Sequence, residues 1–88
     1  MSKRVLWEVI PRVFGTLGWA VRVRRANDNR WHTEFISDNK AVAIQEAVAS
    51  CRWWLLAWGE NSELRIKNRW GKIQDSRTYG DDPENVRG

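Results

Sequence analysis

The sequence predicts an α+β domain of two layers, in which one long helix packs on one face of an antiparallel sheet. Over residues 38–58 the apolar side chains recur every three or four positions, which is the period of a helix face. Segments before and after this stretch alternate apolar with polar side chains, which is the period of strands. The expected order of elements is therefore β-β-β-α-β-β, in a single domain formed by the 88 residues.

Three strands are expected before the helix, at residues 4–10, 18–25 and 30–36. Pro11 ends the first strand because proline has no amide to donate to a sheet. The connection between the second and third strands is rich in Asn and Asp, whose side chains favour tight turns, so these two strands should form a hairpin.

The second strand, GWAVRVRR, separates its apolar from its charged side chains most clearly. Trp19 lies on its apolar side, and Arg22 and Arg24 lie on the other. The same alternation assigns Trp31 of the third strand to the apolar side. The sheet is thus expected to have an apolar inner face, covered by the helix, and a basic outer face.

The helix has clear start and stop signals. Ser37, Asp38 and Asn39 are all candidates for the residue that accepts hydrogen bonds from the first amides, and Gly59 is expected to end the helix. The face expected to be buried consists of Ile44, Ala47, Val48, Cys51, Leu55 and Trp58.

Two short strands are expected after the helix, at residues 63–68 and 72–76, joined by a turn at 69–71. The remaining residues from Arg77 are polar and rich in turn formers, and 84–88 are expected to form a frayed tail.

A second apolar line on the helix allows two interpretations. Val42, Ala49, Trp53 and Leu56 lie on a different side from the expected core face, and Trp54 makes the C-terminal half apolar nearly all round. Either loops cover this line as part of a wide core, or it is an exposed patch for self-association or for a protein partner. The second interpretation gives these candidate interface residues: Val42, Trp53, Trp54 and Leu56.

The basic outer face of the sheet gives a competing hypothesis. Its expected members are Arg22, Arg24, Arg65, Lys67 and Lys72, in a chain of net charge +4. Such a face can contact nucleic-acid phosphates. Glu8, Glu34 and Glu63 are expected on the same side and would neutralise part of it.

Catalysis and cofactor binding are poorly supported. One histidine, His32, and one cysteine, Cys51, supply neither a zinc-ligand set nor a convincing nucleophile and base. Asp81 and Asp82 fit an acidic turn better than a cation site. We therefore expect no enzyme activity, no metal, no cofactor and no small-molecule substrate. The single cysteine, the lack of a signal-peptide pattern and the lack of a long apolar run predict a cytoplasmic protein without a membrane span.

Several short motifs resemble one family. They are Gly18-Trp19-Ala20-Val21, Ala43-Ile44 with Ala47, Glu63-Leu64, Gly71-Lys72-Ile73 and Tyr79-Gly80-Asp81-Asp82-Pro83. Over residues 18–83 the chain resembles domain of unknown function 2188, a small bacterial and phage family with a closing Tyr-Gly-x-Asp-Pro motif. The resemblance implies the fold and a bacterial or phage origin, but no activity. The helix half CRWWLLAW departs from the charged, alanine-rich pattern typical of the family.

The sequence therefore favours a small non-enzymatic protein-binding module, from a phage or mobile element, that acts on a host protein or associates with itself through the tryptophan-rich end of the helix. The alternative is a nucleic-acid-binding domain that uses the basic outer face of the sheet.

Overall fold

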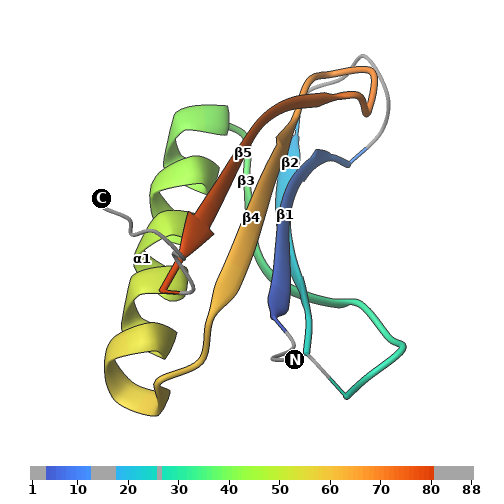
Figure 1. Cartoon of the computed structure of the whole chain (residues 1–88). Coiled ribbons are helices and arrows are strands. Elements are labelled where there is room, and N and C mark those ends of the chain that lie inside the picture. Colours follow the sequence, from blue (N-terminus) through green and yellow to red (C-terminus); the bar gives the residue numbers. More distant parts are fainter. Residues whose placement is uncertain (1–3, 13–17, 26, 81–88) are drawn as a thin grey trace.

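The protein is a two-layer α+β domain, as the sequence predicts. The structure, a computed structural model, describes residues 4–12, 18–25 and 27–80. Its elements are β1 (Val5–Pro11), β2 (Trp19–Arg24), β3 (His32–Ser37), α1 (Lys40–Trp58), β4 (Ser62–Lys67) and β5 (Ile73–Tyr79). The five strands form one sheet in the order β3-β2-β1-β4-β5, and α1 covers one face of it (Figure 1).

The sheet is mixed, so the expectation of a fully antiparallel sheet is wrong. β1 lies at its centre and pairs antiparallel with β2 but parallel with β4, while β5 pairs antiparallel with β4. The cause is the connection through α1. After two hairpins β3 runs in the same direction as β1, α1 returns across the sheet, and β4 therefore starts again in the direction of β1.

The core lies between α1 and the inner face of the sheet. The sheet supplies large side chains, of which Trp7 and Leu64 are almost completely buried. The helix supplies small ones, because its fully buried residues are Ala43, Ala47 and Cys51. This line is rotated from the expected one, so that Ile44, Val48 and Leu55 lie half-buried at its edge and Trp58 is exposed.

The helix ends are capped by two of the predicted residues. The side-chain oxygen of Asn39 accepts hydrogen bonds from the amides of Ala41 and Val42 at 2.8 and 3.3 Å. Gly59 has a φ of 66° and donates its amide to the carbonyl of Leu55 at 2.9 Å. Of the three candidates for the N-terminal cap, Asn39 is the one used.

A β-bulge in β3 places Trp31 on the face opposite to the one expected. Val21 pairs with Phe35, but the next residue, Arg22, pairs with Thr33, so one extra residue lies between the two partners on β3. An extra residue inverts the alternation of side chains beyond it. Trp31 consequently lies on the outer face with Arg22 instead of in the core.

The start of the closing motif packs against the end of α1. Tyr79 is half-buried against the core, and Gly80 has a φ of 92°. A Cβ atom on Gly80 would lie 2.5 Å from the side-chain oxygen of Asn61 and 2.7 Å from a methyl carbon of Leu55. The rest of the motif, Asp81, Asp82 and Pro83, lies outside the described residues, as does the expected tail at 84–88.

Candidate functional site

The side of α1 that faces away from the sheet carries exposed apolar residues. Leu56 is 88% exposed and Trp53 is 55% exposed, with Val42 and the small residue Ala49 on the same side. We call Val42, Ala49, Trp53 and Leu56 the outer helix face. Trp58 is also exposed, and its ring meets that of Trp53 edge to face at a centroid distance of 6.2 Å. Two tryptophans and a leucine thus lie uncovered at one end of the helix.

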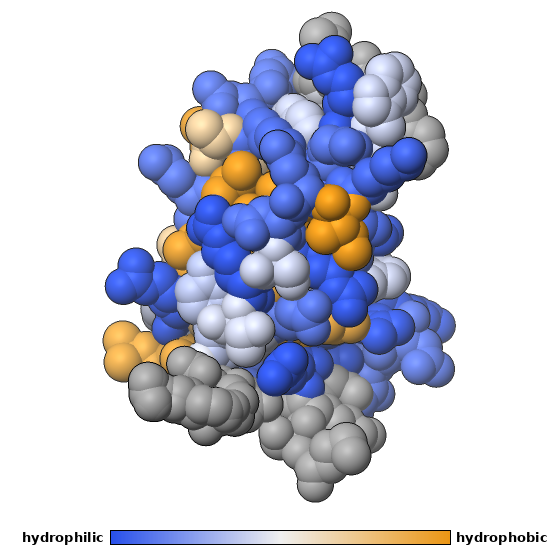
Figure 2. Space-filling view, turned by 45° about the horizontal axis from the view of Figure 1, so that its top comes forward, coloured by the Kyte–Doolittle hydropathy of each residue, from blue (hydrophilic) through white to orange (hydrophobic). Residues whose placement is uncertain are grey.

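Exposed apolar residues elsewhere are isolated. Ile36 lies on β3, Trp70 on the turn before β5, and Ile73 on β5. The face in Figure 2 is mainly hydrophilic, with separate apolar areas. Within the described part of the chain, α1 is therefore the element that carries several large exposed apolar side chains together.

Trp54 differs from the other residues predicted to form an interface. Its ring packs edge to face against Trp7 of the core at a centroid distance of 5.9 Å. The guanidinium of Arg25 lies over it, 4.5 Å from the ring centroid, and Arg25 also pairs with Glu60 at 3.8 Å. Trp54 therefore belongs to the edge of the core and not to the exposed surface of the helix.

Shallow hollows flank the outer helix face. One is lined by Glu46, Ala49, Ser50, Trp53 and Trp54. The other is lined by Arg52, Leu55, Leu56 and Tyr79. Protein interfaces commonly pair projecting side chains of one partner with hollows of the other, and the outer helix face offers both.

The outer face of the sheet is organised around Glu8, which is only 3% exposed. Its Oε1 atom accepts hydrogen bonds from Nε of Arg22 at 2.8 Å and from Nη2 of the same residue. Its Oε2 atom lies 3.3 Å from Nζ of Lys67. Two of the five predicted nucleic-acid contacts are thus paired with one buried carboxylate, which offsets one of their two positive charges.

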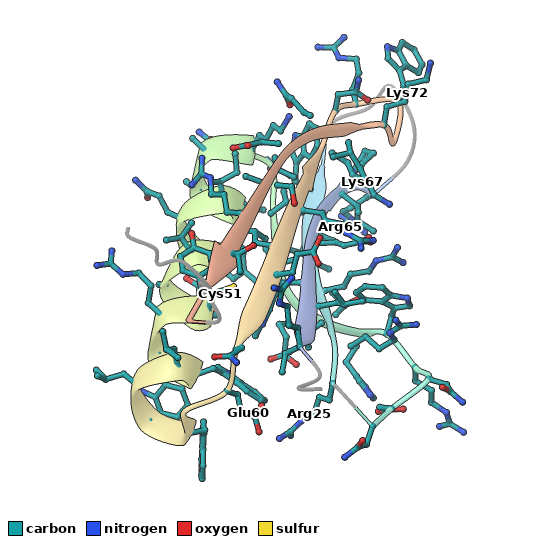
Figure 3. The ribbon with its side chains drawn as sticks, in the orientation of Figure 1. Arg25, Cys51, Glu60, Arg65, Lys67 and Lys72 are labelled. Carbon is teal, nitrogen blue, oxygen red and sulfur yellow. The ribbon has the colours of Figure 1, made fainter. Side chains whose placement is uncertain are left out.

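A second acidic residue neutralises another of the predicted contacts. Glu63 accepts a hydrogen bond from Nε of Arg65 at 3.0 Å and lies 3.9 Å from the guanidinium of Arg4. In Figure 3, Arg65 and Lys67 extend from the sheet on the side away from α1, and Lys72 lies at the turn between β4 and β5. Most of the basic residues of the outer face thus form ion pairs within the domain.

Trp31 is the residue of this face that sequence reasoning missed. The guanidinium carbons of Arg22 and Arg24 lie 4.3 and 5.4 Å from its ring centroid. Arg24 makes no ion pair with any acidic residue of the described chain. No signal in the sequence marks the bulge that brings this aromatic ring among the basic residues.

The residues whose side chains could take part in catalysis, His32 and Cys51, do not form a common site. The ring of His32 lies 3.0 Å from Asp28, and this hydrogen bond lowers the pKa of the Asp28 carboxyl. Cys51 is buried between helix and sheet, and burial raises the pKa of its thiol to about 12, so it carries no reactive thiolate near neutral pH. The described residues contain no group of three or more histidine, cysteine or acidic side chains placed to hold a metal ion.

Comparisons with known proteins give no match, whether to protein-family models, to curated proteins or to solved structures. Among the described residues, no helix has the length and apolar character needed to cross a membrane.

Proposed function

We propose that this chain is a protein-binding domain whose contact surface is the outer helix face together with Trp58. The observation that carries the proposal is that Trp53 and Leu56 are exposed while the core beneath α1 is filled without them. Burying apolar surface stabilises by about 25 cal/mol per Å², so exposed side chains of this size forgo stabilisation that a partner would supply.

The residue types also suit an interface. Tryptophan is enriched among the residues that contribute most to binding, because it buries a large area with little loss of side-chain freedom. The edge-to-face contact between Trp53 and Trp58 restrains both rings before any partner arrives. A surface arranged in advance loses less conformational entropy on binding.

The test is a matched pair of variants. Trp53→Ala removes a tryptophan from the outer helix face, and Trp70→Ala removes one of similar exposure, 61%, from the turn before β5. Both should unfold at nearly the wild-type urea concentration, because neither ring is in the core.

Two kinds of association are measured. Light scattering gives the mass and therefore self-association, and a pairwise binding assay gives the affinity for any purified protein that the wild type binds. Trp53→Ala should lose this association at all salt concentrations, and Trp70→Ala should keep it. Equal loss in both variants, or severe unfolding of Trp53→Ala, would contradict the proposal.

Nucleic-acid binding is the second candidate, and Trp31 is the observation that favours it. An aromatic ring beside Arg24 can stack on a base while the arginine contacts phosphate. The pairing of Arg22, Lys67 and Arg65 with glutamates weighs against it. Under this candidate, Arg24→Glu should weaken the binding of single-stranded DNA at low salt and flatten its salt dependence.

We also propose that the chain is related to domain of unknown function 2188 and works in the cytoplasm. The backbone at Gly80 supports the first point, because a positive φ and close contacts with Asn61 and Leu55 explain a glycine after Tyr79. A single cysteine, which has no partner for an internal disulfide, supports the second.

A further inference from the structure

We infer that the partner of the outer helix face is a second copy of this chain, bound with its α1 antiparallel across a two-fold axis that passes near Ala49. This inference rests on the proposed function and names the occupant of the same surface. It follows from the order of side chains along the exposed side of α1.

The exposed side of α1 is complementary to the same side of a second α1 that runs in the opposite direction. Glu46 and Arg52 lie three residues before and after Ala49, and Val42 and Leu56 lie seven residues before and after it. In an antiparallel pair centred on Ala49, residues at equal distances from the centre meet at the same height. Each Glu46 then lies at the height of Arg52 of the second copy, on the opposite flank of the seam, and each Val42 meets Leu56 of the second copy near the middle of the seam. A two-fold interface requires this self-complementarity.

The two charged residues are available for such contacts. Glu46 and Arg52 are both exposed, and in the described chain neither side chain forms an ion pair or a hydrogen bond. With a rise of about 1.5 Å per residue, each lies about 4.5 Å along the helix from the centre. Long side chains span the seam at that height, so two equivalent ion pairs form around the axis.

The centre of the seam is suited to close approach. Ala49 is exposed and has no side chain beyond Cβ, which lets two helix backbones come near each other. The hollow beside it, lined by Glu46, Ser50 and Trp53, is open to a side chain of the second copy. One helix face of this length gives an interface below about 1,200 Å², so we expect a dimer that dissociates on dilution, with a dissociation constant on the order of micromolar or weaker.

Charge reversal tests the register. Glu46→Arg brings two guanidinium groups together at the seam, because the new side chain meets Arg52 of the second copy, and Arg52→Glu brings two carboxylates together. Each variant should raise the dimer dissociation constant at least about tenfold, as read by sedimentation over a dilution series. An equal mixture of the two variants should form a heterodimer of about wild-type strength. Arg69→Glu, the same charge change at an exposed turn residue, should leave the dimer unchanged.

Cysteine crosslinking gives a second readout that depends on geometry. The native thiol, Cys51, is buried, so it does not compete. Ala49→Cys should form a disulfide-linked dimer under mild oxidation, because the two copies of this residue meet at the axis. Val42→Cys alone should not, because its two copies are about 21 Å apart along the helices. A mixture of Val42→Cys with Leu56→Cys should crosslink.

The outcomes separate this inference from the proposed function. A wild type that stays monomeric at every concentration, or single charge variants that dimerise as the wild type does, would overturn the inference. Loss of binding to another protein in Trp53→Ala, with a monomeric wild type, would overturn the inference and keep the proposed function. Association that ignores Trp53 altogether would overturn both.

Discussion

Replacing Glu8 with glutamine tests the role of the buried carboxylate on the outer face of the sheet. In the native chain this group accepts hydrogen bonds from Arg22 at 2.8 Å and lies 3.3 Å from Lys67. Glutamine keeps the shape and one acceptor oxygen but removes the charge. Two cationic side chains, 29% and 21% exposed, would then lie against a neutral amide.

The size of the effect follows from burial. Breaking a fully buried ion pair by neutralising one partner costs about 3–5 kcal/mol, and partial exposure of the two cations lets water replace part of the loss, so we expect about 2 kcal/mol. For a domain of this size that corresponds to a fall in melting temperature of about 10 °C. Calorimetry or urea unfolding measures both quantities.

Glu63→Gln is the matched control, since Glu63 also holds two cations, Arg65 and Arg4. Its side chain is 22% exposed against 4% for Glu8, so the same change should cost no more than about 1 kcal/mol. Equal losses in the two variants would refute the argument that burial makes Glu8 special. Glu8→Gln should also bind duplex DNA more tightly than the wild type at low salt, because Arg22 and Lys67 lose their competing anion.

Three further changes test other parts of the structure. Asn39→Ala should cost about 1 kcal/mol by removing the helix cap, whereas Asp38→Ala should cost little in urea unfolding. Gly80→Ala should lower the free energy of unfolding clearly more than Gly59→Ala. Both glycines have a positive φ, which costs an alanine about 1 kcal/mol, but only at Gly80 would the added Cβ also collide with neighbouring atoms. The free energy of unfolding should fall as pH rises from about 9 to about 12. The reason is that the Cys51 thiol has a pKa of about 12 in the folded state and 9.0 in the unfolded chain, so over this range only the unfolded chain loses the proton. The variant Cys51→Ala should lack this part of the pH dependence.

The sequence was informative where structure depends on local chemistry. Gly59 ends α1 because its positive φ suits glycine, and the alternation in GWAVRVRR gives β2 its apolar and basic sides. The two-layer arrangement followed from one helix among strands. These features depend on neighbours in the chain, which the sequence displays directly.

Features that depend on distant pairing were not predictable. The parallel pairing of β1 with β4 is set by where α1 delivers the chain, and no residue of either strand encodes it. The bulge opposite Val21 and Arg22 carries no glycine or proline signal, so Trp31 was assigned to the wrong face. The burial of Glu8 likewise needs β2 and β4 on its two sides.

The choice of helix face was the decisive ambiguity in the candidate site, and side-chain size resolves it. Both lines of α1 are apolar, so periodicity alone does not say which one meets the sheet. The sheet already brings Trp7, Trp19 and Leu64 to the interface between the layers, which leaves room only for small partners. Ala43, Ala47 and Cys51 therefore lie directly beneath the helix, the larger Ile44, Val48 and Trp54 pack at the edge of the core, and Val42, Trp53 and Leu56 face outward.

This distribution separates stability from association. Substitutions at the outer helix face remove nothing from the core, so selection for a stable fold alone does not explain Trp53 or Leu56. On an ordinary surface helix these positions would be polar, because exposed apolar side chains promote unwanted contacts. Their apolar character, beside an unpaired Glu46 and Arg52 in self-complementary order, is what an interface requires and what a core does not.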